Sequence, residues 1–74
     1  MSLEDKIYKA VNSGLKCETI NVSGDGTHFD LYVISDDFKG LSKLERHRMI
    51  YQVLGTELVN EIHALSMKLL TKSE

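Results

Sequence analysis

The chain has 74 residues, of which 42% are hydrophobic and 27% are charged, and its formal net charge is −2. We expect residues 1–74 to form one domain, which leaves little room for both a core and a deep active-site pocket and argues against a self-contained enzyme. No stretch approaches the roughly 18 apolar residues of a membrane span. The slightly acidic balance also differs from the positive excess of a dedicated nucleic-acid binder.

The N-terminus and the cysteine content favour a cytoplasmic protein. The first residues lack the basic patch and apolar run of a secretory signal. The single cysteine, Cys17, cannot form an internal disulfide, and a small domain that folds without one suits a reducing compartment.

The first predicted element is a helix over Ser2–Ser13. Ser2 precedes the helix as its N-cap, with Asp5 three residues on, and Gly14 is a stop signal. The apolar residues of this segment recur at helical spacing, namely Leu3, Ile7, Ala10, Val11 and Leu15.

Two strands follow and are predicted to form an antiparallel hairpin. Thr19–Val22 alternates as a first strand, Ser23–Gly26 is a glycine-rich turn, and His28–Ser35 is a second strand. One face of the second strand carries Phe29, Leu31 and Val33, and the other carries His28, Asp30, Tyr32 and Ile34.

A loop that begins at Asp36 leads to the second helix. Ser42 and Glu45 match a capping box, which predicts a helix over Lys43–Leu54. After one glycine, Thr56–Glu61 is expected to add a short third helical piece.

The last predicted element is a strand over Ile62–Leu70, with a polar tail, Thr71–Glu74, that we expect to be frayed. One face of this strand carries His63, Leu65, Met67 and Leu69. The helical crossover before it favours parallel pairing with the second strand and a right-handed connection. The predicted fold class is α+β, in the order helix-strand-strand-helix-helix-strand, with a three-stranded mixed sheet and helices on one face.

Two histidines are brought to one end of this predicted sheet. His28 begins the second strand, His63 begins the third, and neighbouring strands are about 4.8 Å apart. Structural metal sites usually close with four protein ligands, so two imidazoles predict a half-site that a partner completes. The alternative is that both are surface histidines that bind no metal.

Two further residues have competing interpretations. Cys17 is either a thiolate ligand or redox thiol, or a small buried apolar residue, and we favour the second. His47 shares its helix face with apolar residues, and we interpret it as a packed, hydrogen-bonded histidine.

Four cations surround the start of the second helix: Lys39, Lys43, Arg46 and Arg48. Cations beside a helix N-terminus can contact phosphates. A solvated helix face is the favoured interpretation, since no aromatic residue lies among them as in single-strand binders. No nucleophile elbow and no paired-histidine helix motif occurs, so the sequence predicts no enzyme.

Four segments of the chain, in order and spacing, resemble the BolA family. They are Val22–Phe29, Val33–Gly40, Arg46–Tyr51 and Ile62–Met67, which together extend over nearly the whole chain. The phenylalanine-x-glycine step, the Arg-His-Arg helix and the His-Ala-Leu strand are specific in combination. The Gly-Asp-Gly-Thr-His-Phe form is most similar to the short bacterial branch.

The resemblance implies a fold similar to type II KH domains and a non-enzymatic adaptor that partners a monothiol glutaredoxin. The pair would hold a bridged two-iron two-sulfur cluster, with thiolates from the glutaredoxin and from glutathione, in cluster trafficking or iron sensing. The family ligand in the His-Ala-Leu motif corresponds here to His63. The second family ligand comes from the loop between the first two strands, where His28 is the nearest residue of the right type.

The resemblance also implies a helix after the last strand, and we expect that closing helix to be absent from these residues. The KH-like fold supplies an alternative function in transcription and stress response, with DNA as the partner. It would use the four cations Lys39, Lys43, Arg46 and Arg48. A homodimer is the remaining expected assembly.

Overall fold

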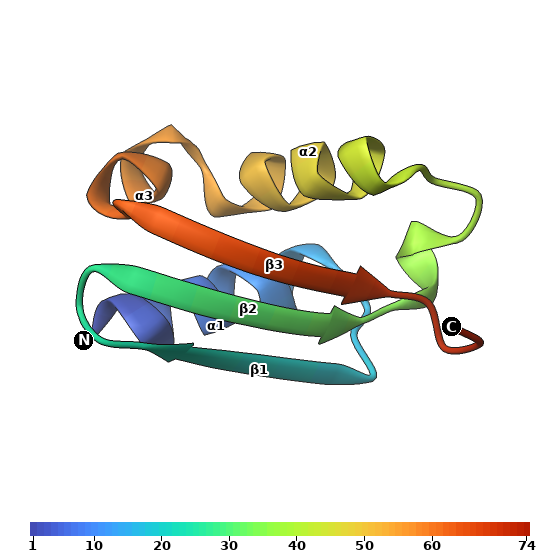
Figure 1. Ribbon diagram of the computed structural model, residues 1–74, viewed down its shortest axis with the longest axis horizontal. Helices are drawn as coiled ribbons and strands as arrows, with labels where there is room; N and C mark the ends of the chain where they lie inside the picture. Colours follow the sequence, from blue (N-terminus) through green and yellow to red (C-terminus); the bar gives the residue numbers. More distant parts are fainter.

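Seven elements of secondary structure follow one another in a computed structural model that describes all 74 residues (Figure 1). In chain order they are α1 (Leu3–Gly14), β1 (Thr19–Gly24), β2 (His28–Ile34), the short 3-10 helix η1 (Asp36–Phe38), α2 (Lys43–Leu54), α3 (Thr56–Glu61) and β3 (Ala64–Leu70). None of the α-helices has the length and apolar character needed to cross a lipid bilayer.

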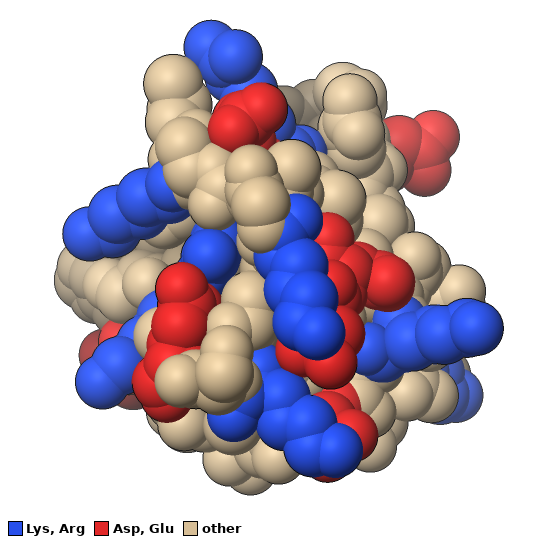
Figure 2. Space-filling model, turned by 90° about the vertical axis from the view of Figure 1, so that its right-hand side faces the viewer, with Lys and Arg blue, Asp and Glu red and all other residues tan.

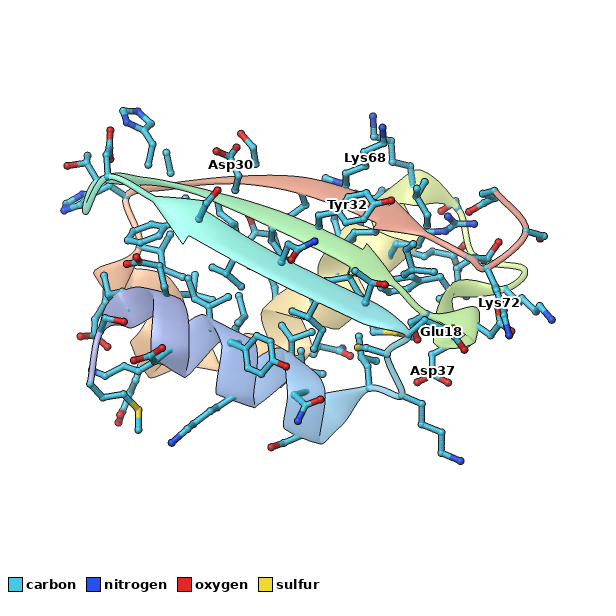
Figure 3. The ribbon with its side chains drawn as sticks, turned by 90° about the horizontal axis from the view of Figure 1, so that it is seen from below. Glu18, Asp30, Tyr32, Asp37, Lys68 and Lys72 are labelled. Carbon is cyan, nitrogen blue, oxygen red and sulfur yellow. The ribbon has the colours of Figure 1, made fainter.

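The three strands form one mixed sheet in the order β1-β2-β3. β1 pairs with β2 antiparallel, and β2 pairs with β3 in parallel, in a register from His28 opposite Ala64 to Ile34 opposite Leu70. The helices lie on one side of this sheet and leave the other side open (Figures 1 and 3). The predicted α+β class, element order and mixed sheet are confirmed.

The hydrophobic core lies between the sheet and the helix layer. The apolar face predicted for β2 is buried, and residues of α1 and α2 pack against it. Burying one such side chain fully contributes about 2 kcal/mol, so this contact between layers is the main source of stability. The nine core residues are Ile7, Val11, Phe29, Leu31, Val33, Phe38, Ile50, Leu54 and Leu69.

Helix α1 starts at its predicted N-cap. At its end, Gly14 allows close packing against α2. The hydroxyl of Ser2 accepts a hydrogen bond from the Asp5 N–H at 3.1 Å, as an N-cap does. The helix ends at Gly14, one residue after the predicted end. A Cβ there would lie 2.6 Å from Cγ1 of Val53, so the missing side chain lets α1 approach α2 closely.

The boundaries of α2 agree with the predicted ones, and a capping box formed by Ser42 and Glu45 sets its start. The Ser42 hydroxyl accepts from the Glu45 N–H at 3.2 Å, and the Glu45 carboxylate accepts from the Ser42 N–H at 2.8 Å. These hydrogen bonds also lower the pKa of Glu45. The capping box is therefore present in both directions.

The loop predicted after β2 contains a short helix that the sequence analysis missed. The buried hydroxyl of Ser35 accepts from the Asp37 N–H at 3.1 Å and donates to the Lys16 carbonyl at 2.6 Å. This arrangement starts η1 and directs Phe38 into the core, where it is fully buried.

The start of β3 and the chain after it also differ from prediction. Ile62 is the C-cap of α3, and its N–H donates a hydrogen bond to the Val59 carbonyl. The chain then bends at His63, and the strand begins at Ala64. The predicted inclusion of Ile62 and His63 in the strand was wrong. The tail is not frayed, because Thr71 is buried and Glu74 is bound by Arg46.

Candidate functional site

The turn between β1 and β2 is organised by Asp25, which fixes the backbone of His28. The Asp25 carboxylate accepts from the Thr27 N–H at 2.9 Å and from the His28 N–H at 2.8 Å, and these bonds lower its pKa. Gly24 approaches the Phe29 ring so closely that a Cβ would lie 2.4 Å from it. The hairpin therefore holds the His28 backbone in one place.

The His28 side chain is free to contact a partner. It is 74% exposed, and its Nδ1 lies 3.9 Å from a carboxylate oxygen of Asp25. This separation is longer than a hydrogen bond, so the exposed ring is not held by Asp25 and can turn toward a partner.

His63 lies at the same end of the sheet. It is exposed in the bend before β3 and precedes Ala64, the register partner of His28. Adjacent strands are about 4.8 Å apart, so the backbones of the two histidines are close although 34 residues separate them in sequence. This proximity follows from the parallel pairing of β2 and β3.

The chain does not supply enough ligands for a closed metal site. No group of three or more His, Cys, Asp or Glu side chains is arranged to hold a metal ion. Two exposed imidazoles at one end of a sheet fit the chemistry of a half-site, to which a second molecule contributes the remaining ligands.

Two of the four cations in the predicted cluster are occupied by contacts within the chain. The Arg46 side chain is only 13% exposed, and its guanidinium hydrogen-bonds to the Glu74 carboxylate and to the carbonyls of Leu41 and Leu69. Lys39 pairs with Asp36 at 3.5 Å.

Lys43 and Arg48 are the two members of this cluster without an acidic side chain in ion-pair contact. Figure 2 shows this end of the molecule, where Lys and Arg side chains are interspersed with Asp and Glu. The mixed surface agrees better with a solvated face than with a dedicated phosphate-binding patch.

Cys17 and His47 are both half-buried. Burial, and secondarily the Asp37 carboxylate, raise the pKa of the Cys17 thiol, as expected for a packed apolar residue. The packing of His47 is confirmed, but no group of the chain hydrogen-bonds to its ring, which instead lines a groove beside β3. The predicted hydrogen bond of His47 was wrong, because Arg46 and Glu74 in that groove hydrogen-bond to each other and not to the imidazole.

Sequence reasoning missed the roles of Asp25 and Glu74. An aspartate three residues before a histidine in a tight turn is a detectable signal for the first contact. The second joins α2 to the chain after β3, 28 residues away, and no local pattern indicates it.

Comparisons with known proteins give a family match and named relatives. The profile of the family described as BolA-like protein matches residues 4–74. The chain is 45% identical over 51 residues to the DNA-binding transcriptional regulator BolA of Haemophilus influenzae, across 69% of this chain and 50% of that protein. It is 31% identical over 71 residues to the acid stress protein IbaG of Escherichia coli, across 95% and 84% of the two chains. This chain thus matches half the length of the first relative and most of the second.

Solved structures give the same result for the fold. BolA1 from Arabidopsis thaliana superposes with a TM-score of 0.88 at 27% identity, over 100% of this chain and 96% of that one. The BolA domain of SufE1 from the same plant superposes with a TM-score of 0.87 at 32% identity, over 99% and 95%.

Proposed function

Because this chain belongs to the BolA-like protein family, we propose that it is an adaptor that shares a two-iron two-sulfur cluster with a monothiol glutaredoxin. The family assignment confirms the prediction that the domain is not an enzyme. In this proposal the adaptor acts in the cytoplasm, in cluster trafficking or iron sensing.

The observation that carries the proposal is the pair of exposed histidines at one end of the sheet. His28 and His63 are fixed by a hairpin turn and by the bend after α3, and no third ligand from the chain accompanies them. A shared cluster requires this incomplete set, since the glutaredoxin and glutathione supply thiolates. Imidazole in place of thiolate raises the reduction potential of such a cluster.

Asp25 supports His28 as the second ligand. Metal-binding histidines usually present their other ring nitrogen to a carboxylate or carbonyl, which orients the ring. The Asp25 carboxylate is already 3.9 Å from Nδ1, and its pKa is lowered, so it is ionised at neutral pH. A turn of the ring toward Asp25 would therefore leave Nε2 as the ligand atom of His28.

The test is a titration followed by visible absorption and circular dichroism. The chain is mixed with a monothiol glutaredoxin, iron, sulfide and glutathione, as wild type and as the His63→Ala and His28→Ala variants. We expect a cluster spectrum that differs from that of the glutaredoxin alone and that reverts with His63→Ala. If the His28→Ala variant also gives the spectrum of the glutaredoxin alone, His28 is the second ligand.

The matched control is His47→Gln, which changes a histidine far from this end of the sheet and should leave the spectrum unchanged. A glutaredoxin spectrum unaffected by the wild-type chain contradicts cluster sharing. A changed spectrum that survives His63→Ala contradicts the assigned ligand and leaves cluster sharing intact.

The second candidate function is nucleic-acid binding, and the name of the Haemophilus influenzae relative favours it. In a KH-like fold the contacts would come from Lys39, Lys43, Arg46 and Arg48. Only Lys43 and Arg48 of these are without an ion-pair partner in the chain, so we rank this function second. Affinity for DNA that falls with salt and with Lys43→Glu supports it, and no binding at low salt removes it.

We also propose that the chain acts under stress and that it forms a homodimer. The Escherichia coli relative is named an acid stress protein, which favours a stress-linked role for this chain. Sedimentation of the isolated chain as a dimer supports a homodimer, and a monomer at all accessible concentrations excludes it.

A further inference from the structure

β3 is an edge strand, and part of its outer side has no hydrogen-bond partner within the sheet. The sheet ends at β3, and the Leu70 carbonyl accepts from the Ser35 N–H on the β2 side. Because alternate residues of a strand direct their backbone groups to opposite sides, the N–H and C=O groups of Leu65, Met67 and Leu69 face outward.

Arg46 covers one end of this open edge. Its guanidinium donates to the outward carbonyl of Leu69 at 3.0 Å and is held there by Glu74. The outward groups of Leu65 and Met67 and the N–H of Leu69 remain available. Edge groups of this kind are the template that an added strand uses.

A groove runs beside the same stretch of β3. Its volume is about 590 Å³, and it lies between β3 and the first turns of α2. The apolar lining side chains are Leu41, Met67, Leu69 and Leu70, and the polar ones are Lys43, Arg46, His47, Lys68 and Glu74.

The charge of this groove is positive although the whole chain is negative. Glu74 is its only acidic residue and is paired with Arg46. Lys43 and Lys68 make no ion pair in the chain, so their charges are uncompensated. The groove therefore favours an anionic occupant.

We propose that the outer edge of β3 and this groove bind an extended acidic segment of a partner protein, which adds to the sheet as a fourth strand. The backbone of the segment pairs with Leu65 and Met67. Its carboxylates meet Lys68, on the open side of the sheet. This docking is separate from the histidine end and goes beyond the proposed cluster function.

The two faces of β3 determine the sequence pattern of the segment. Leu65, Met67 and Leu69 are opposite the buried residues of β2 and lie on the helix side of the sheet. Lys68 projects from the open side beside Tyr32, away from the helices (Figure 3). Side chains of an added strand alternate in the same way, so the segment should carry apolar residues toward Met67 and acidic residues toward Lys68.

The first test measures binding of two dye-labelled peptides to the isolated chain by fluorescence anisotropy. Each peptide has seven residues, the length of β3, and alternates leucine with either glutamate or lysine. We expect the glutamate peptide to bind about tenfold more tightly, and Lys68→Glu to weaken it about fivefold. The control Lys9→Glu changes an exposed lysine on α1 and should have no effect.

The second test uses amide hydrogen exchange by NMR, because strand addition protects specific groups. Leu65 and Met67 amides should exchange at least about tenfold more slowly with the glutamate peptide bound. Ser66 and Lys68 already face β2 and should change little. Met67→Pro removes an outward N–H without removing a bond to β2, so it should abolish binding. If that variant does not fold, the exchange pattern of the wild type decides.

Three outcomes overturn the proposal. Equal affinity for the lysine peptide removes the charge argument. Binding without protection of Leu65 and Met67 removes strand addition. Displacement of the peptide by single-stranded DNA of higher affinity assigns the groove to nucleic acid. Since no glutaredoxin or iron is present, failure here leaves the cluster proposal untouched.

Discussion

The guanidinium of Arg46 hydrogen-bonds twice to the carboxylate of Glu74, at 2.6 Å from Nη1 to Oε1 and 3.0 Å from Nη2 to Oε2. The guanidinium carbon also lies 5.9 Å from the centre of the Phe38 ring. Arg46 thereby connects α2, η1 and the chain after β3. In sequence, Arg46 lies in a cluster of cations and is expected to be solvated. In the structure, its charge-assisted hydrogen bonds give it a structural role.

This contact predicts how acid affects stability. The pKa of Glu74 falls from 4.5 to about 2, chiefly because Arg46 donates hydrogen bonds to it and secondarily because the Thr71 N–H does. A carboxylate that is more acidic when folded contributes stability that is complete above its unfolded pKa. The contribution declines as pH falls below about 4.5 and is lost below about pH 2.

We therefore expect Glu74→Gln to lower the melting temperature at pH 7. The difference in melting temperature from wild type should narrow steadily from about pH 4.5 down to about pH 2. Thermal unfolding followed by circular dichroism across this range checks it. The control is Glu57→Gln, an exposed glutamate of α3 without an ion-pair partner, whose gap should stay small and flat. A Glu74→Gln gap that does not change with pH would show that the ion pair adds no stability.

Local signals in the sequence predict the local parts of the fold. The Ser42 and Glu45 pair lies within four residues and sets the start of α2 at the predicted position. The alternation of β2 likewise predicts its buried face, since a one-residue shift would expose every core side chain.

Contacts between distant segments account for what the sequence did not predict. The bend at His63 exists because α3 and β3 run in different directions, which depends on where the sheet lies. Arg46 and Glu74 meet only after α2 and β3 have packed. The closeness of the two candidate histidines is an exception among these long-range features. It depends only on the parallel pairing of β2 and β3, which the sequence does predict.

Removal of the N-cap of α2 should lower the free energy of unfolding moderately, without changing the rest of the fold. We expect Ser42→Ala to lower the free energy of unfolding by about 1 kcal/mol, because the Glu45 N–H loses its acceptor. Urea denaturation should show an unchanged dependence on urea concentration and a lower midpoint. Ser13→Ala, at an exposed position near the end of α1, is the matched control. An equal loss in both variants would contradict a specific capping role.

A side chain at Gly24 should disturb the hairpin that holds His28. The Cβ of Gly24→Ala would lie 2.4 Å from the Phe29 ring and 2.8 Å from the His28 carbonyl, so one of them must move. We expect a loss of about 1–3 kcal/mol in urea denaturation, typical of overpacking. Ser23→Ala, at the exposed preceding position, should stay within about 0.5 kcal/mol of wild type. A neutral Gly24→Ala would mean that the Phe29 ring can turn aside without loss of packing.

The interpretation of Cys17 as a packed residue makes a prediction for its reactivity. Burial raises the pKa of its thiol and the Asp37 carboxylate adds to the shift, so little thiolate is present near neutral pH. We expect iodoacetamide at pH 8 to modify Cys17 about tenfold more slowly than free glutathione, and unfolding in urea to remove the difference. Cys17→Ala should leave the cluster spectrum with glutaredoxin unchanged, because the thiol lies at the end of the sheet opposite His28 and His63. Fast alkylation of the folded chain, or loss of the cluster in Cys17→Ala, would instead restore Cys17 as a thiolate ligand.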